Sequence, residues 1–208
     1  MMAMRFGIIL LVIGLTGCIG GGAPAPHVRQ YILEYAPPRI GKVTATEAVL
    51  KVERFTAARH HAGPAMLYRQ GPFRRDAYRE RRWRVAPGDM VADFLLRDLR
   101  HAGLFRAVLA ARDPEETRFV LTGGVEEFSE AADGERRKAV LDATVTLLDL
   151  SIREIPGRVM FQKNYRSEAP IVQEGDADLA EAMSRAMSQF SAQVITDIDQ
   201  ALKRRAAN

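Results

Sequence analysis

The sequence predicts an α+β fold in which a curved, mostly antiparallel sheet carries two amphipathic helices packed on one face. Two patterns predict this class: several segments alternate apolar and polar residues as strands do, and two longer segments repeat apolar residues at helical spacing. A third observation concerns the start of the chain, where a short apolar run ends at the only cysteine among 208 residues. We therefore expect a signal peptide over residues 1–17, a tether over 18–26 and a single domain over 27–208.

The first seventeen residues have the pattern of a cleaved secretory signal. One positive charge, Arg5, precedes about ten apolar residues, whereas a membrane-spanning helix needs about 20. Leu15-Thr16-Gly17-Cys18 resembles the bacterial lipobox. This resemblance implies that the Cys18 sulfur takes a diacylglycerol and becomes the mature N-terminus, and buried acyl chains then hold the protein at a membrane. An uncleaved membrane anchor with an incidental cysteine is the alternative.

The residues from Cys18 to Pro26 predict a lipidated N-terminus and a tether. Three glycines, Gly20 to Gly22, favour a flexible chain, and the alanine–proline pairs that follow favour a stiffer, extended one. Residue 19 is Ile19 rather than Asp, which by resemblance to Gram-negative lipoprotein sorting implies the outer membrane. We thus expect a lipoprotein signal peptide followed by a periplasm-facing domain, lipid-anchored in the outer membrane.

Strands in the N-terminal half are short and are separated by turn residues. We expect strands over residues 30–35, 48–55, 65–69 and 77–85, the last two forming a hairpin around Gly71-Pro72. Pro87 opens a helix that runs to His101, because apolar residues recur there at helical spacing and Gly103 follows. A short strand over residues 104–109 should follow this helix.

The C-terminal half predicts an antiparallel meander and a long helix. Strands over 119–128 and 140–152 are joined across Asp133-Gly134, and a third strand covers 159–165. In the middle strand the apolar positions change parity after Leu147, which predicts a bulge or a strand end covered on both faces. The helix over 177–204 has acidic residues at its start and basic residues at its end, as the helix dipole favours.

Positive charge is concentrated in one strand of the predicted hairpin. Residues 74–84, RRDAYRERRWR, hold six arginines and two acidic residues, and we call them the arginine stripe. Lipid headgroups, an acidic protein partner or nucleic acid could each explain it. We expect no nucleic acid partner, because no recognition motif accompanies the arginines. Solvated arginines on an exposed strand face are the simplest alternative.

No group of residues is arranged for catalysis, and we expect neither an enzyme nor a cofactor. The sequence has no nucleophile elbow, phosphate loop or zinc-protease motif. His60 and His61 predict a solvated pair in a loop, because no cysteine or spaced carboxylate completes a metal site. Gly123 and Gly124, inside a strand, indicate a bulge or a close backbone approach rather than a phosphate cradle.

The ordered motifs resemble one family. The lipobox Cys18, the segments YILEY and AMLYRQGPF, and above all RRWRVAPGDMVADFLLRDLRHAGLFRAVL over residues 81–109 resemble the ABC-type transport auxiliary lipoproteins, the PqiC-like proteins. The matching positions are Trp83, Pro87, Leu95, Leu99, Gly103 and Phe105. The resemblance implies a non-catalytic, outer-membrane-anchored subunit of an MCE-domain (mammalian cell entry) lipid transport system. This subunit docks or stabilises the transport conduit at the outer membrane, and the ATPase is another chain.

Docking would place the partner-binding residues on the arginine stripe. We expect Arg79, Arg81, Arg82, Trp83 and Arg84 to bind the MCE-domain tunnel protein, because arginine and tryptophan are enriched at interface hot spots. A core residue packed under the first helix is the alternative interpretation of Trp83. A homo-oligomer would also suit a conduit.

Two other functions are consistent with the same sequence. The lipoprotein could scaffold or activate another envelope machine, such as a cell-wall synthase or an outer-membrane assembly complex. Direct carriage of a lipid by the domain is a further possibility, and it would need an apolar cavity.

Overall fold

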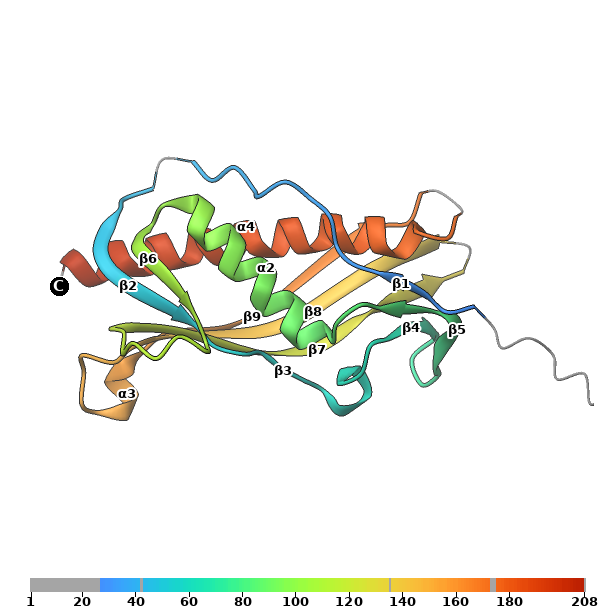
Figure 1. Cartoon of the computed structure of the whole chain (residues 1–208), viewed down its shortest axis with the longest axis horizontal. Helices are drawn as coiled ribbons and strands as arrows, with labels where there is room; N and C mark the ends of the chain where they lie inside the picture. Colours follow the sequence, from blue (N-terminus) through green and yellow to red (C-terminus); the bar gives the residue numbers. More distant parts are fainter. Residues whose placement is uncertain (1–26, 42, 135, 173–174, 208) are drawn as a thin grey trace, which may run out of the picture.

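Nine strands and three α-helices occupy the part of the chain that the computed structural model describes, which is residues 27–41, 43–134, 136–172 and 175–207 (Figure 1). The strands are β1 (Arg29–Tyr31), β2 (Thr46–Val52), β3 (Thr56–Ala57), β4 (Ala65–Gln70), β5 (Arg75–Trp83), β6 (Phe105–Ala110), β7 (Phe119–Asp133), β8 (Arg136–Asp149) and β9 (Val159–Pro170). The helices are α2 (Pro87–Ala102), α3 (Ile155–Arg158) and α4 (Asp178–Ala207), with a 3-10 turn, η1, over Arg59–His61. The α+β class is confirmed; the short strand β3 and the turns α3 and η1 were not expected.

The long strand β7 organises the sheet. On one side it pairs with β8, and β8 with β9, in the antiparallel meander that the sequence predicts. On its other side β2, β3 and β4 run parallel to successive parts of β7. Strand β6 lies parallel to β2, β5 is antiparallel to β4, and β1 is parallel to β5. The sheet is therefore mixed and curls into a half-barrel, because residues 46–70 follow β7 in three steps instead of returning against it.

Two glycine turns close the hairpins at one end of the sheet. Gly71 has a φ of 86° between β4 and β5, and Gly134 has a φ of 61° after β7. A residue with a Cβ is strained at such positive φ values, so glycine permits these tight reversals. Both turns were predicted, although β7 continues to Asp133, further than expected.

Helices α2 and α4 cover the concave face of the sheet (Figure 1). Helix α2 begins at Pro87 and ends before Gly103, whose φ of 66° is the left-handed conformation that commonly terminates helices. Apolar residues of both helices are almost completely buried against the sheet, including Leu95, Leu99 and Phe190. This burial is the main source of stability, since removal of apolar surface from water drives folding.

Residues 32–41 and 43–45 cross the outer side of both helices, and Figure 1 shows this crossing segment in blue above them. The Tyr35 hydroxyl donates to Asp98 Oδ2 of α2 at 2.7 Å. The Glu34 backbone N–H donates to Ser184 Oγ of α4 at 3.0 Å. The helices are therefore held between the sheet and the crossing segment.

The sheet shows a bulge and a close approach at the two positions where the sequence suggested them. Leu147 of β8 pairs with Phe161 and Leu148 with Val159, so a bulge lies after Leu147 as predicted, with the extra residue in β9. A Cβ on Gly123 would lie 2.5 Å from a ring carbon of Phe55, which confirms a close approach there. Strand β8 itself keeps its alternation through the bulge, and this places Asp149 on the buried face.

Candidate partner-binding surface

The expected lipidation residue, Cys18, lies outside the described residues. The first described residues lead into β1, which runs parallel to β5 with Arg29 beside Arg81. The chain therefore enters the domain next to the arginine stripe. The described chain thus begins at the same end of the molecule as the predicted partner-binding strand.

Strand β5 divides the arginine stripe between its two faces. Arg79, Arg82 and Arg84 are exposed, and among the described residues neither Arg79 nor Arg82 takes part in an ion pair. The Arg84 guanidinium donates to Gln30 Oε1 of β1 at 3.0 Å. These three side chains lie at the exposed surface of β5 and the residue that follows it. We call them the outer arginines.

Arg81 points inward and belongs to a buried ion-pair network. Its guanidinium lies 2.8 Å from Asp178 at the start of α4, and Arg137 of β8 contacts the same carboxylate at 2.8 Å. Arg137 also binds Glu130 in a bidentate arrangement, at 2.7 and 2.9 Å. Because these charges neutralise each other, Arg81 joins β5 to α4, and its role is structural.

Tyr78 completes this network from the same face of β5. Its hydroxyl donates to Glu130 Oε2 at 2.7 Å. Burial raises the pKa of Tyr78 to about 12, and the hydrogen bond to Glu130 adds to this effect. The phenol therefore remains protonated and acts as a fixed hydrogen-bond donor at any physiological pH.

Trp83 is a core residue, so the structure corrects its expected place on the partner-binding surface. Only 1% of its surface is exposed, and its ring packs edge-on against Phe128 with centroids 5.1 Å apart. Trp83 lies on the same face of β5 as Arg81, and the irregular pairing between β4 and β5 brings Tyr78 to that face as well. A partner cannot reach this ring without unfolding the hairpin.

His61 is also buried, which corrects the expectation of a solvated histidine pair. His60 is exposed, whereas His61 is 2% exposed and its Nε2 accepts a hydrogen bond from the Phe128 backbone N–H at 3.4 Å. That N–H follows an irregularity in the pairing of β7 between Val125 and Glu127. Burial, followed by the proximity of His60, lowers the pKa of His61 to about 4, so the ring stays neutral and can accept.

A second arginine cluster lies at the opposite end of the domain, around Asp149 of β8. Its carboxylate is fully buried and receives both Nε and Nη2 of Arg118, at 3.1 and 2.9 Å. Ser151 donates to it at 2.6 Å, and Arg205 of α4 lies 3.5 Å away. Hydrogen bonding to Arg118 lowers the pKa of Asp149 to about 2. Sequence could not pair these groups because they come from three distant segments.

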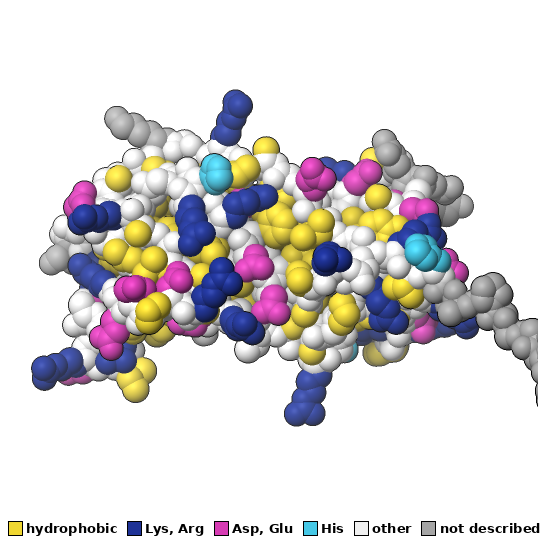
Figure 2. All heavy atoms as spheres, viewed as in Figure 1, with side chains coloured by type: hydrophobic (Ala, Val, Ile, Leu, Met, Phe, Trp, Pro, Cys, Tyr) yellow, Lys and Arg dark blue, Asp and Glu magenta, His cyan; other side chains and the backbone are white. Residues whose placement is uncertain are grey.

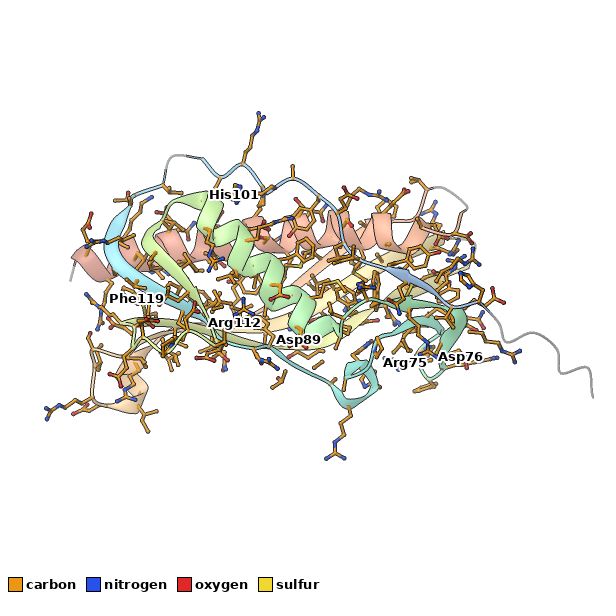
Figure 3. The ribbon with its side chains drawn as sticks, viewed as in Figure 1. Arg75, Asp76, Asp89, His101, Arg112 and Phe119 are labelled. Atoms are coloured by element: carbon orange, nitrogen blue, oxygen red, sulfur yellow. The ribbon has the colours of Figure 1, made fainter. Side chains whose placement is uncertain are left out.

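An open groove of about 650 Å³ borders this cluster. It is lined by Arg118, Phe119, Leu202 and Arg205 together with residues 44–47 at the start of β2. Figure 3 labels Phe119 near this end and Arg75 and Asp76 towards the other. The arginines of the groove already bind Asp149, which distinguishes them from the outer arginines.

The described residues contain neither a metal-binding cluster nor a helix that could cross a membrane. No group of three or more His, Cys, Asp or Glu side chains there is placed to hold a metal ion. None of the helices in that part of the chain has the length and apolar character needed to cross a membrane. Figure 2 shows basic and acidic side chains interspersed over the helix-bearing face, with apolar side chains between them.

Comparison with known families matched residues 31–195 to the ABC-type transport auxiliary lipoprotein component. The match begins at Tyr31, the last residue of β1, and ends at Ile195 inside α4, so it includes strands β2 to β9, helix α2 and the first part of α4. No match was found among curated proteins.

Solved structures share the fold at low sequence identity. The protein XCC0632 from Xanthomonas campestris aligns with a TM-score of 0.78 and 19% identity, over 87% of this chain and 100% of its own. An uncharacterized protein aligns with a TM-score of 0.63 and 15% identity, over 83% of this chain and 99% of its own. The hypothetical protein CT253 from Chlamydia trachomatis aligns with a TM-score of 0.53 and 7% identity, over 74% and 96%.

Proposed function

The chain belongs to the family of ABC-type transport auxiliary lipoprotein components, and from this membership we propose that it serves an MCE-type lipid transport system. It acts as a non-catalytic, outer-membrane-anchored subunit that faces the periplasm and docks or stabilises the transport conduit. The observation that carries the proposal is the family match over residues 31–195, preceded in the sequence by the lipobox at Cys18.

Lipidation of Cys18 supplies the attachment in this proposal. Acyl chains contribute about 0.8 kcal/mol for each buried CH₂, and two or more chains make anchoring stable. Eight residues lie between Cys18 and His27, and the nine Cα-to-Cα steps that join these two residues span at most about 30 Å. The domain is therefore kept close to the membrane that holds the anchor.

The outer arginines supply the partner-binding surface. Arg79, Arg82 and Arg84 are exposed along one strand and have no carboxylate partner in the described part of the chain. Guanidinium groups bind carboxylates bidentately and are enriched at hot spots. We assign them to an acidic surface of the MCE-domain tunnel protein, and we assign Arg81 to positioning β5 against α4.

Site-specific photocrosslinking in intact cell envelopes tests the partner. A photoreactive residue placed at Arg79 or Arg82 should crosslink to an MCE-domain protein, whereas the same residue at Gln162, exposed on β9, should not. Recovery of only a cell-wall synthase or an outer-membrane assembly protein from Arg79 and Arg82 would contradict the proposal and favour the alternative function. The mass of the purified complex would also show whether several copies of the chain assemble.

The anchor has its own test. Mature wild-type protein should carry an acylated Cys18 and should fractionate with the outer membrane, whereas Cys18→Ser should remain an unlipidated precursor. Incorporation of labelled palmitate into the Cys18→Ser variant would overturn the assignment of this residue. Recovery of the acylated wild-type protein in the inner membrane would overturn the outer-membrane location alone.

A further inference from the structure

The tip of the β4–β5 hairpin exposes an aromatic side chain between a turn and two arginines. Phe73 is 97% exposed, the largest exposed fraction among the exposed large apolar residues of the described chain. It follows Gly71-Pro72 and precedes Arg74 and Arg75. No neighbouring segment covers the ring, although burial of a phenylalanine is strongly favourable in water. The tip is therefore suited to an environment other than bulk solvent.

The charge beside Phe73 is only partly neutralised. Arg74 Nε donates to Asp76 Oδ2 at 2.7 Å, and both side chains are exposed. Arg75 has a single weak contact, from its Nη1 to the Pro72 carbonyl at 3.5 Å, and it forms no ion pair within the described residues. An aromatic side chain flanked by cations is the combination that favours the boundary between lipid headgroups and acyl chains.

The hairpin tip points to the side from which the chain enters the domain. Strand β1 is parallel to β5, and Arg29 lies beside Arg81, so β1 starts on the side of the domain towards which the start of β5 and its tip point. Figure 1 shows the chain entering at this end, and the turn after β7 and the loop after β9 lie there as well. The loop after β9 carries Val172, which is 74% exposed.

We propose that this end of the domain rests on the membrane surface, with Phe73 inserted at headgroup level and Arg74 and Arg75 bound to lipid phosphates. The proposal rests on the proposed function, because the lipid anchor at Cys18 brings the tip within reach of a bilayer. Arginine binds phosphate oxygens bidentately, so anionic lipid should strengthen the contact. The contact fixes the orientation of the domain, with α3 and its exposed Ile155 directed away from the membrane.

Tryptophan fluorescence of the full-length mature lipoprotein in vesicles tests the contact directly. Trp83 is the only tryptophan of the chain and is buried, so it supplies a constant background. In Phe73→Trp the new indole should be quenched about twofold by lipids brominated near the headgroup end of their acyl chains, and shielded from acrylamide. The matched control is Ile155→Trp, which replaces another exposed residue, 75% exposed, at the far end of the domain. Its indole should respond to acrylamide and not to brominated lipid.

Comparing anionic with zwitterionic vesicles separates insertion of Phe73 from binding of lipid phosphates by Arg74 and Arg75. Phosphatidylethanolamine vesicles containing phosphatidylglycerol should give stronger quenching than phosphatidylcholine vesicles, and Arg74→Gln with Arg75→Gln should remove that difference. Equal exposure of the indoles at positions 73 and 155 to acrylamide would overturn the proposal, as would shielding of position 73 only when a protein partner is added. The mass of the same sample reports acylation of Cys18, so failure of the anchor is recognised separately from failure of the tip contact.

Discussion

At one end of the domain Arg118 and Arg205 surround the buried carboxylate of Asp149, whereas at the other end Arg75, Arg79 and Arg82 form no ion pair within the described residues. The first group joins the start of β7, the end of β8 and the last turns of α4. The second group lies along one exposed strand beside the point where the chain enters. Arginine therefore closes the fold at one end, whereas at the other end these three arginines remain unpaired, in the described part of the chain, beside Arg81, which ties β5 to α4.

The two ends show that the role of an arginine depends on the group it contacts. Its position in an arginine-rich sequence does not reveal that role. A buried carboxylate needs its cation, because an unpaired buried charge is costly. An exposed arginine without a partner contributes little to stability, since solvent screens it. Selection for folding explains the Asp149 cluster, whereas the outer arginines contribute little to folding, and the docking proposed above would give them a role.

The largest expected effect is on stability, from loss of the charge at Asp149. Asp149→Asn keeps the size of the side chain but removes the ionic contacts with Arg118 and Arg205. We expect the free energy of unfolding to fall by about 2 kcal/mol, because breaking a buried charge pair costs several kcal/mol and the half-exposed Arg118 side chain can recover some hydration. Urea denaturation at neutral pH measures the change.

The control for Asp149→Asn removes a carboxylate of the opposite end. Asp76→Asn deletes the partner of Arg74 in an exposed pair and should leave the urea midpoint unchanged within error. Equal losses in the two variants would show that the two ends do not differ in the way proposed.

Acid should remove the same contribution from the wild-type protein. The part of the free energy of unfolding that Asp149 supplies should be lost as the pH falls from the ordinary aspartate pKa to the folded pKa of about 2.

The second effect extends the comparison to the two histidines. His61 is neutral in the fold with a pKa near 4, whereas the unfolded chain binds a proton below about 6.5. Since only the unfolded state gains a proton in this interval, stability should be complete above pH 6.5 and fall as the pH decreases towards 4. At pH 5.5, one unit below the pKa of the unfolded chain, we expect a loss of about 1.4 kcal/mol, since each pH unit in this interval costs about 1.4 kcal/mol of stability.

Paired substitutions isolate this contribution. His61→Gln should flatten the dependence of the urea midpoint on pH between 6.5 and 4, whatever its effect on stability at neutral pH. His60→Gln changes the exposed neighbour and should keep most of the wild-type slope. A flat profile in His60→Gln with a wild-type profile in His61→Gln would reverse the assignment.

Local patterns in the sequence predicted the elements that depend on near neighbours. Gly71 and Gly134 mark the two hairpin turns, Pro87 and Gly103 bound α2, and the parity change after Leu147 coincides with a bulge. Each of these features is fixed by a few consecutive residues and their conformational preferences. For the same reason the α+β class and the long C-terminal helix were predicted.

Features that depend on distant segments could not be predicted in the same way. Strand alternation shows which residues share a face but does not show which face is covered, so Trp83 and Arg81 were placed with the outer arginines. The parallel pairing of β2, β3 and β4 with β7 follows from the path of residues 46–70. His61 is buried beside an irregularity in β7 and accepts a hydrogen bond from the Phe128 N–H, a contact between segments far apart in the sequence.

The smallest expected effect on stability comes from the outer arginines and is the sharpest test of the comparison. Arg79→Gln with Arg82→Gln removes two exposed charges that no described carboxylate balances. The urea midpoint should therefore stay at the wild-type value, while binding to a purified MCE-domain partner should weaken at least about tenfold and lose much of its salt dependence.

Lys163→Gln is the matched control, because it removes an exposed charge that is paired with Asp197 and should leave partner affinity unchanged. A double variant that unfolds more easily yet binds normally would place these arginines with Arg118 as structural residues, and the docking surface would then have to lie elsewhere on the domain.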